Sequence, residues 1–223
     1  MPQFDVIGAL FDMDGLLLDT ERVGMHVLRD VIAPYGHTSA QSDAIYLGLV
    51  GTSQEYTAAA LRRAAPSVDP AELEAIWHAR VDAIMAGGVP LRPTVAESLD
   101  ALSADCVPMA VVTTTRTARA RQHLEKAGLL HHFADVIGRD RVAAPKPDPA
   151  PYLAGAAALG LAPAQCAAFE DSDTGTRAAV GAGCRTWQIP DLRPDASALP
   201  DLGQSVASSL NEALRDAGLL GDT

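Results

Sequence analysis

The feature that most constrains the fold is an alternation of short apolar runs with helix-like segments through the second half of the chain. Residues 109–112 and 166–169 contain no charged side chain, which is typical of strands buried on both faces of a parallel sheet. An earlier run of the same kind covers residues 6–11. Because helical patterns separate these runs, the sequence predicts an α/β fold with a doubly wound parallel sheet.

An all-helical block interrupts this alternation after the first apolar run. Between Asp19 and Gly88 no strand pattern appears, whereas helix signals recur. The clearest is residues 69–72, where a capping aspartate precedes a proline and an acid in the first turn. A segment rich in glycine and proline, residues 87–93, is typical of a linker. We therefore expect an α/β core made of residues 1–18 and 90–223, with an inserted helical cap made of residues 19–89.

Helix ends and faces can be predicted at three further places. Residues 94–97 have the pattern of a capping box that begins with Thr94. Asp173 is expected to cap a helix that starts near Gly175. The helix after Asp69 is expected to bury one apolar face, formed by Leu73, Ile76, Trp77, Val81 and Ile84.

The charge balance argues against two classes of partner. The chain has 17 basic and 28 acidic residues, and its formal net charge is −11 at pH 7. Because nucleic-acid-binding proteins present a basic face, no nucleic-acid partner is expected, and an acidic chain is equally unsuited to an anionic membrane. The uncharged residues 149–169 contain prolines and are too weakly apolar to span a bilayer. No obligate protein partner is evident in the sequence.

Cysteine usage indicates the compartment. The cysteines are few, widely spaced and without a C-x-x-C pair, so we expect reduced, mostly buried thiols and a cytoplasmic protein. No positive charge precedes Asp12, so no signal peptide is expected. The six histidines form no constellation in the sequence.

Chemically useful side chains follow the expected strands. Open α/β sheets bind ligands at the carboxyl ends of their strands, so the residues at those positions are the candidates for a site. A carboxylate cluster with one ammonium group and no histidine suits a hard cation, Mg²⁺ rather than Zn²⁺. The candidates are Asp12 and Asp14, Thr113 and Thr114, Lys146 in a proline-rich loop, and Glu170 and Asp171.

The candidates lie in four segments: FDMDGLLLDTE at 11–21, VVTTTR at 111–116, KPDP at 146–149 and EDSDTG at 170–175. In this order, the segments resemble the haloacid dehalogenase superfamily of phosphotransferases. The resemblance covers nearly the whole chain, including the helical insert, and within the superfamily the chain is similar to the β-phosphoglucomutase-like branch with a small helical cap. The resemblance implies a Rossmann-like core.

The resemblance implies a role for each carboxylate. Asp12 would be the nucleophile that forms an aspartyl phosphate, and Asp14 would be the general acid and base. The carboxylates of Asp12 and Asp171 and the backbone carbonyl of Asp14 would hold Mg²⁺, with Glu170 beside them as a fourth candidate ligand.

Phosphate binding would fall to other residues. Thr113 would bind a phosphoryl oxygen with the backbone N–H of Thr114, and Lys146 would contact both the phosphoryl group and Asp12. In the cap, Gln54 stands where the mutases of this branch carry an arginine that grips a distal phosphate. Gln54 is therefore the candidate substrate-binding residue of the cap.

The predicted function is Mg²⁺-dependent hydrolysis of a small phosphorylated metabolite, a sugar or polyol phosphate. The alternative is a sugar-phosphate mutase of the β-phosphoglucomutase type. Such mutases use a cap histidine to restrain the catalytic acid, and the matching position here is Gly24. Gln54 is also neutral, although Arg22, Arg62 or Arg63 could supply the missing charge.

Two other classes fit less well. A phospho-receiver domain would need an acidic strand end between Asp14 and Thr113 and has no helical insert. A dehalogenase would lack an acid at the position of Asp14.

Overall fold

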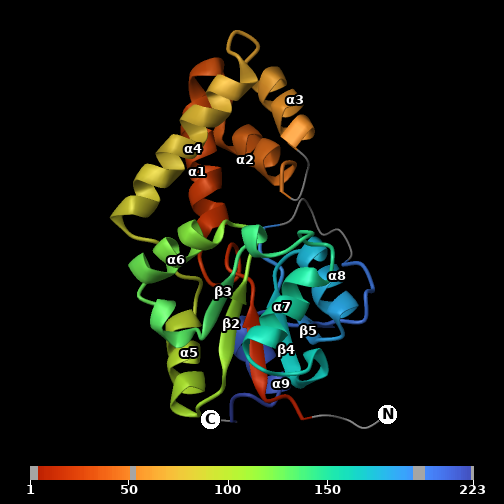
Figure 1. Ribbon diagram of the computed structural model, residues 1–223. Helices are drawn as coiled ribbons and strands as arrows, with labels where there is room; N and C mark the ends of the chain where they lie inside the picture. The colour runs from red at the N-terminus through yellow and green to blue at the C-terminus, as the bar shows by residue number, and fades with distance from the viewer. Residues whose placement is uncertain (1–4, 51–53, 193–198, 222–223) are drawn as a thin grey trace. The chain divides into compact units, whose positions relative to one another are not determined.

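The computed structural model describes residues 5–50, 54–192 and 199–221. Its contacts divide the chain into two compact units (Figure 1). The core unit comprises Met1–Leu18, Pro90–Asp191 and Leu199–Thr223, and the helical unit comprises Asp19–Val89 with Leu192–Ala198. No helix among the described residues is both long and apolar enough to cross a membrane.

The core unit contains a six-stranded sheet in which every neighbouring pair is parallel. The strand order is β3-β2-β1-β4-β5-β6, which confirms the predicted doubly wound topology. The chain passes from β1 to β2 and β3 on one side of the sheet and then returns to β4 on the other side of β1. The strands are β1 (Gly8–Phe11), β2 (Met109–Val112), β3 (Asp135–Ile137), β4 (Cys166–Glu170), β5 (Arg185–Gln188) and β6 (Ser205–Val206).

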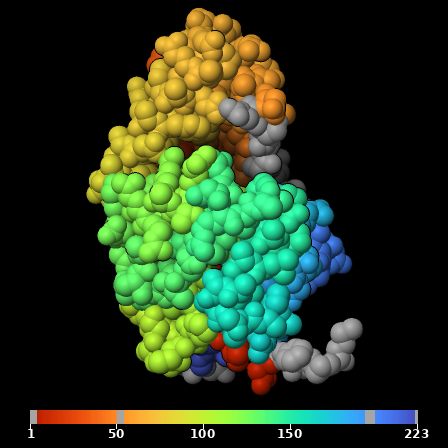
Figure 2. All heavy atoms as spheres, in the orientation of Figure 1, coloured from red at the N-terminus to blue at the C-terminus, as the bar shows by residue number. Residues whose placement is uncertain are grey.

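Alternating side chains of the strands build two apolar layers. Leu10 and Ala168 point to the face that α7 and α8 cover, and there they pack with Tyr152 and other buried residues. On the opposite face the rings of Phe11 and Phe169 stack at 5.2 Å between centroids. In the space-filling view of Figure 2, the green and teal segments, which include α5, α6 and α7, form much of the visible face of the core unit. The helices of the core unit are α5 (Val95–Ala104), α6 (Thr117–Lys126), α7 (Ala150–Ala158), α8 (Asp173–Ala182) and α9 (Leu210–Asp216), with 3-10 turns η2 (Leu130–His132), η3 (Arg139–Arg141) and η4 (Pro163–Gln165).

The helical unit packs around the apolar face of α1, on which Val27, Leu28 and Ile32 are buried. One helix was not expected. It is α2, which begins after a capping box formed by Thr38 and Gln41. The helices of this unit are α1 (Thr20–Ile32), the 3-10 turn η1 (Ala33–Tyr35), α2 (Ser39–Leu47), α3 (Gln54–Ala64) and α4 (Pro70–Gly87).

The expected apolar face of α4 is partly wrong. Leu73 and Trp77 are buried, but Ile76 and Ile84 are 38% and 50% exposed, and Met85 is buried instead. Apolar residues occur all round this helix, so the sequence pattern does not select the stripe that packs against α1 and α3.

Two helix caps also differ from expectation. Thr94 has a left-handed backbone, with φ of 64°, and its side chain makes no capping hydrogen bond. A capping threonine needs an extended backbone, so the expected capping box does not form. At α8 the cap is Ser172, whose Oγ accepts from the N–H of Gly175 at 3.0 Å. Asp173 is the first helical residue and accepts a hydrogen bond from Gln188 at 2.8 Å.

The three cysteines are unpaired thiols, as expected. Cys166 and Cys184 are buried, whereas Cys106 is exposed just after α5.

Candidate active site

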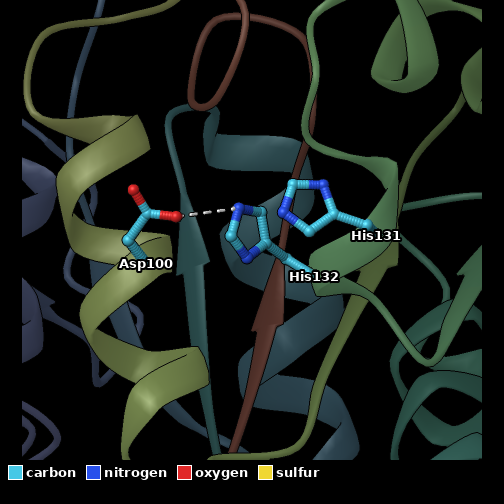
Figure 3. A group of neighbouring side chains, drawn as sticks. All are labelled: Asp100, His131 and His132. Atoms are coloured by element: carbon cyan, nitrogen blue, oxygen red, sulfur yellow. Dashed lines mark ion pairs between the residues drawn. The ribbon is translucent and has the colours of Figure 1, made fainter.

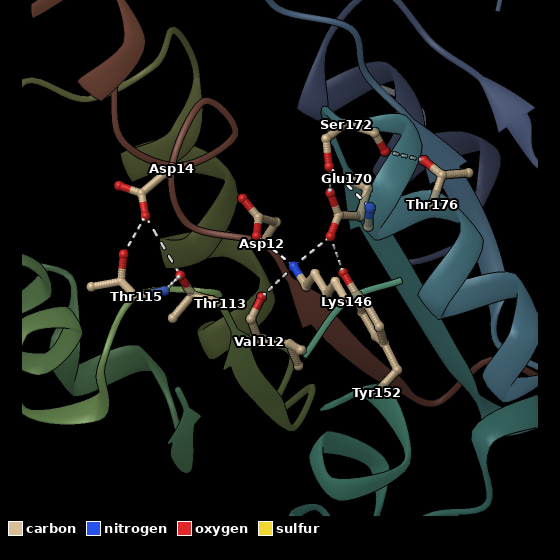
Figure 4. Close-up of polar contacts among 11 residues, drawn as sticks. Asp12, Asp14, Val112, Thr113, Thr115, Lys146, Tyr152, Glu170, Ser172 and Thr176 are labelled. Atoms are coloured by element: carbon tan, nitrogen blue, oxygen red, sulfur yellow. Dashed lines mark hydrogen bonds and ion pairs between the residues drawn. The ribbon is translucent and has the colours of Figure 1, made fainter. Parts of the chain in front are cut away.

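The site lies at the carboxyl ends of β1, β2 and β4. Phe11, the last residue of β1, pairs with Val111 on one side and Phe169 on the other. Asp12, Val112 and Glu170 therefore come to the same edge of the sheet (Figure 4). Since the direction of the winding changes between β1 and β4, this edge is also the crevice where ligands bind in open α/β sheets.

The ammonium group of Lys146 is the centre of the site. Its Nζ lies 2.6 Å from Oδ1 of Asp12 and 2.5 Å from Oε1 of Glu170, and it also donates to the carbonyl of Val112 at 2.8 Å. These three contacts match the three N–H donors of an ammonium group. The Lys146 side chain is only 3% exposed, so the two ion pairs are shielded from solvent and fix its position.

Glu170 is held from three sides. Tyr152 Oη donates to Oε1 at 2.6 Å, and Ser172 Oγ donates to Oε2 at 3.0 Å, in addition to the contact with Lys146. The residue is completely buried. The first turn of α8 passes so close that a Cβ on Gly175 would overlap the Glu170 carboxylate. Glycine at 175 therefore makes room for the carboxylate.

Burial and charge shift the pKa values of these groups. Burial would lower the pKa of Lys146, but the carboxylates of Asp12 and Glu170 outweigh it and raise the pKa above the usual value. Burial raises the pKa of Asp12 well above the usual range, and Lys146 opposes this rise. Burial, followed by the charge of Glu170, raises the pKa of Tyr152, so its hydroxyl stays a hydrogen-bond donor.

Asp14 points to the end of β2. Its Oδ2 accepts from Thr115 Oγ1 at 2.9 Å and lies 3.5 Å from Thr113 Oγ1. Thr113 Oγ1 also accepts from the N–H of Thr115 at 3.0 Å. Gly15 follows with φ of 86°, a left-handed conformation that allows the chain to turn sharply after Asp14.

Three carboxylates could hold a metal ion. One oxygen each from Asp12, Glu170 and Asp171 lies within 4.8 Å of the others, and Asp12 and Glu170 are buried. An all-oxygen set of this kind fits a hard divalent cation. Because both oxygens of Glu170 already accept hydrogen bonds, its carboxylate is oriented by its neighbours before any ion binds.

The structure brings most of the predicted site residues together. Asp12, Lys146, Glu170 and Asp171 form one group, and Asp14 and Thr113 form a second at the neighbouring strand end. Thr114 lies between Thr113 and Thr115 and is exposed. Gln54 is the first residue of α3 in the helical unit, and its side chain lies outside the described residues.

Sequence reasoning missed three supporting residues: Tyr152, Ser172 and Thr115. Thr115 and Ser172 stand beside predicted site residues, so their hydroxyls were visible as candidates in the sequence. Tyr152 gave a weaker signal. It begins the apolar face of a helix, where an aromatic residue usually serves only for packing.

Comparison with known proteins identifies the family of the chain. The haloacid dehalogenase-like hydrolase family matches residues 9–189. Protein CbbY of Rhodobacter capsulatus is 32% identical over 222 residues, covering 86% of this chain and 97% of the relative. Fructose-1-phosphate phosphatase YqaB of Escherichia coli is 33% identical over 186 residues, covering 79% of this chain and 92% of the relative.

A solved structure shows the same fold. The crystal structure of a HAD family hydrolase from Deinococcus radiodurans R1, with bound phosphate and sodium, superimposes with a TM-score of 0.83. It is 32% identical, and the match covers 100% of both chains. The chain therefore belongs to the haloacid dehalogenase-like hydrolase family, and the predicted enzyme class, a phosphoric monoester hydrolase, is confirmed.

Proposed function

We propose that the protein is a Mg²⁺-dependent phosphatase that hydrolyses a small sugar or polyol phosphate through an aspartyl phosphate on Asp12. The observation that carries the proposal is the buried ion pair of Asp12 and Lys146, 2.6 Å long, which lies beside Glu170. A second acid, Asp14, follows Asp12 two residues later in the chain. The contact of Lys146 with one oxygen orients the Asp12 carboxylate, and the other oxygen of the carboxylate can attack phosphorus. The named activity of YqaB supports the substrate class.

Asp12, Asp171 and the backbone carbonyl of Asp14 are the groups that we assign to Mg²⁺, with Glu170 beside them. When bound, the ion would neutralise charge on the phosphoryl oxygens and on the attacking carboxylate. The donor set fits the ion because the side chains of Asp12, Glu170 and Asp171 that lie together offer only carboxylate oxygens.

The residues of the chain then divide the reaction into two displacements. In the first, an Asp12 oxygen attacks phosphorus, the bond from phosphorus to the ester oxygen breaks, and Asp14 protonates the leaving alcohol. In the second, Asp14 takes a proton from water, the water oxygen attacks phosphorus, and the bond to Asp12 breaks. Lys146 stabilises negative charge on the phosphoryl group in both steps.

Thr115 orients the acid–base residue in this scheme. Its hydroxyl donates to Asp14 at 2.9 Å and so directs the carboxylate to the end of β2. Thr113, which contacts the same oxygen at 3.5 Å, stands where we assign a phosphoryl oxygen.

The packing around Gly24 supports hydrolysis over phosphoryl transfer to a second sugar. A Cβ at this position would lie 2.7 Å from Tyr46 Oη, which itself donates to Glu21 at 2.8 Å. The carbonyl of Gly24 accepts from Trp77 Nε1 at 2.9 Å, which fixes this turn of α1. No side chain fits at 24 without moving Tyr46. Position 24, which carries the restraining histidine in the mutases, therefore has no room for a histidine side chain here.

The first experiment measures phosphate release from a panel of phosphorylated metabolites, with Mg²⁺ and with EDTA. We expect turnover of at least one sugar or polyol phosphate with Mg²⁺ and none in EDTA, with recovery on adding Mg²⁺ back. Ca²⁺ should restore much less activity, because its looser coordination misplaces the nucleophile. Full activity in EDTA would refute the metal assignment.

The mutase alternative is tested with β-glucose 1-phosphate, Mg²⁺ and a trace of glucose 1,6-bisphosphate. We expect inorganic phosphate to accumulate faster than glucose 6-phosphate. The reverse order would show that the protein is a mutase.

A further inference from the structure

A second cluster of metal-ligating side chains lies in the core unit, apart from the catalytic group (Figure 3). Asp100 and Ser103 stand one turn apart on α5, and His131 and His132 form the end of the 3-10 turn η2. The sequence, in which these residues lie about 30 positions apart, gave no reason to join them. The packing of α5 against η2 brings them together.

The ring of His132 is fixed between the two residues of α5. Its Nδ1 lies 2.8 Å from Ser103 Oγ, and its Nε2 lies 3.5 Å from Asp100 Oδ1. Its side chain is only 4% exposed, whereas that of Asp100 is 73% exposed. The buried imidazole therefore presents Nε2 to a carboxylate at the surface.

The distance of 3.5 Å between His132 Nε2 and Asp100 Oδ1 distinguishes a direct hydrogen bond from two ligands of one metal ion. It is longer than an N–H···O hydrogen bond, which spans roughly 2.7–3.2 Å. It is close to roughly 3.4 Å, the spacing of two ligands around a tetrahedral ion with bonds of about 2.0–2.1 Å. The pair is thus spaced like two ligands of one ion.

The other contacts have the form of a built metal site. The rings of His131 and His132 lie 3.9 Å apart between centroids and are tilted by 38°, and one ligand atom from each of His131, His132 and Asp100 lies within 4.8 Å of the others. His131 and Asp100 are exposed, so small side-chain rotations can bring their ligand atoms closer. Ser103 occupies the second nitrogen of His132, as the partner of a metal-bound imidazole does.

We propose that Asp100, His131 and His132 bind one divalent transition-metal ion of the Zn²⁺ type, with water in the fourth position. Two imidazoles and one carboxylate select a borderline ion over Mg²⁺, which prefers oxygen ligands. Such an ion would join α5 to η2, two segments that are distant in the sequence. The site does not depend on the function proposed above.

The experiment titrates Zn²⁺ into the full-length protein by calorimetry, with Mg²⁺ in saturating excess to occupy the catalytic carboxylates. We expect one Zn²⁺ site per chain in the wild type. His131→Ala and Asp100→Asn, both exposed substitutions, should weaken Zn²⁺ binding at least about tenfold. His26→Ala is the matched control, because it removes an exposed histidine on α1 and should leave binding unchanged.

Two further measurements identify the site. Co²⁺ bound to the wild type should give the intense visible absorption of a tetrahedral ion, and His131→Ala should lose it. Asp171→Ala should keep the Zn²⁺ site, since it alters only the catalytic group. Equal Zn²⁺ affinity of His131→Ala and His26→Ala, or loss of the site in Asp171→Ala, would overturn the proposal.

Discussion

Tyr152→Phe tests whether the buried hydrogen-bond network around Glu170 positions the catalytic groups. The substitution removes one oxygen, the donor that contacts Glu170 at 2.6 Å, and leaves the packed ring in place. Glu170 keeps its contacts with Lys146 and Ser172, so its charge remains paired. The change therefore deletes a single charge-assisted hydrogen bond.

The expected magnitude follows from that contact. A hydrogen bond to a charged group contributes about 1.5–3 kcal/mol to stability, and the complete burial of Tyr152 and Glu170 places this one within that range. For a chain of this size, 1 kcal/mol changes the melting temperature by about 2–4 °C, so a decrease of several degrees is expected. Without the Tyr152 hydroxyl, the Glu170 carboxylate can shift by a fraction of an ångström and move Lys146 with it, which should also lower kcat by about tenfold.

The assay compares thermal unfolding and kcat of Tyr152→Phe with those of Tyr35→Phe. Tyr35 is 37% exposed in the helical unit, so its hydroxyl can exchange a protein contact for water. A structural role alone would lower the melting temperature and leave kcat unchanged. If Tyr152→Phe matched Tyr35→Phe in both measurements, the positioning role of this hydroxyl would be refuted.

Three other predictions use the same structural reasoning. Gly175→Ala should abolish activity and lower stability because its Cβ overlaps a buried carboxylate, whereas Gly181→Ala on the same helix meets only one atom, at 3.8 Å, and should keep activity; equal effects in unfolding and turnover assays would contradict this. Thr115→Val should lower kcat more than it raises KM, because it removes the donor to the acid–base carboxylate, and Thr115→Ser should restore most of the loss. Cys106 should react with a thiol reagent in the native protein while Cys184, whose pKa burial raises to about 12, reacts only after unfolding; two or more reactive thiols in the native state would show that the core is open.

Much of the core unit could be predicted because its central strands, β1, β2 and β4, are buried along their whole length. A strand such as β1 then contains only apolar residues and ends where the polar residues of the site begin, so the run and the acids after it mark both the strand and its carboxyl end. In a parallel sheet the carboxyl ends of the strands lie at one edge, so Asp12, Lys146 and Asp171 come close together although they are far apart in the sequence.

The residues that escaped prediction owe their roles to tertiary contacts. Tyr152 has the same pattern as a packing residue, and only the approach of β4 to α7 gives its hydroxyl a partner. His131 and His132 meet Asp100 only because η2 packs on α5. Thr94 has a side chain that suits a helix cap, but its backbone is left-handed. The capping preference of a residue does not set the direction from which the chain enters α5.

The most direct test of the proposed mechanism is a burst experiment with Asp14→Asn and p-nitrophenyl phosphate in the presence of Mg²⁺. The leaving p-nitrophenolate needs little protonation, so loss of the acid should spare the first displacement while loss of the base blocks hydrolysis of the phosphoenzyme. We predict a burst of one p-nitrophenolate per chain, followed by very slow turnover, with the phosphoryl group found on Asp12 by peptide mass spectrometry after acid quench. Asp12→Asn should show neither the burst nor the modification. Linear release from Asp14→Asn without a burst, together with an unmodified Asp12 peptide, would contradict covalent catalysis at this residue.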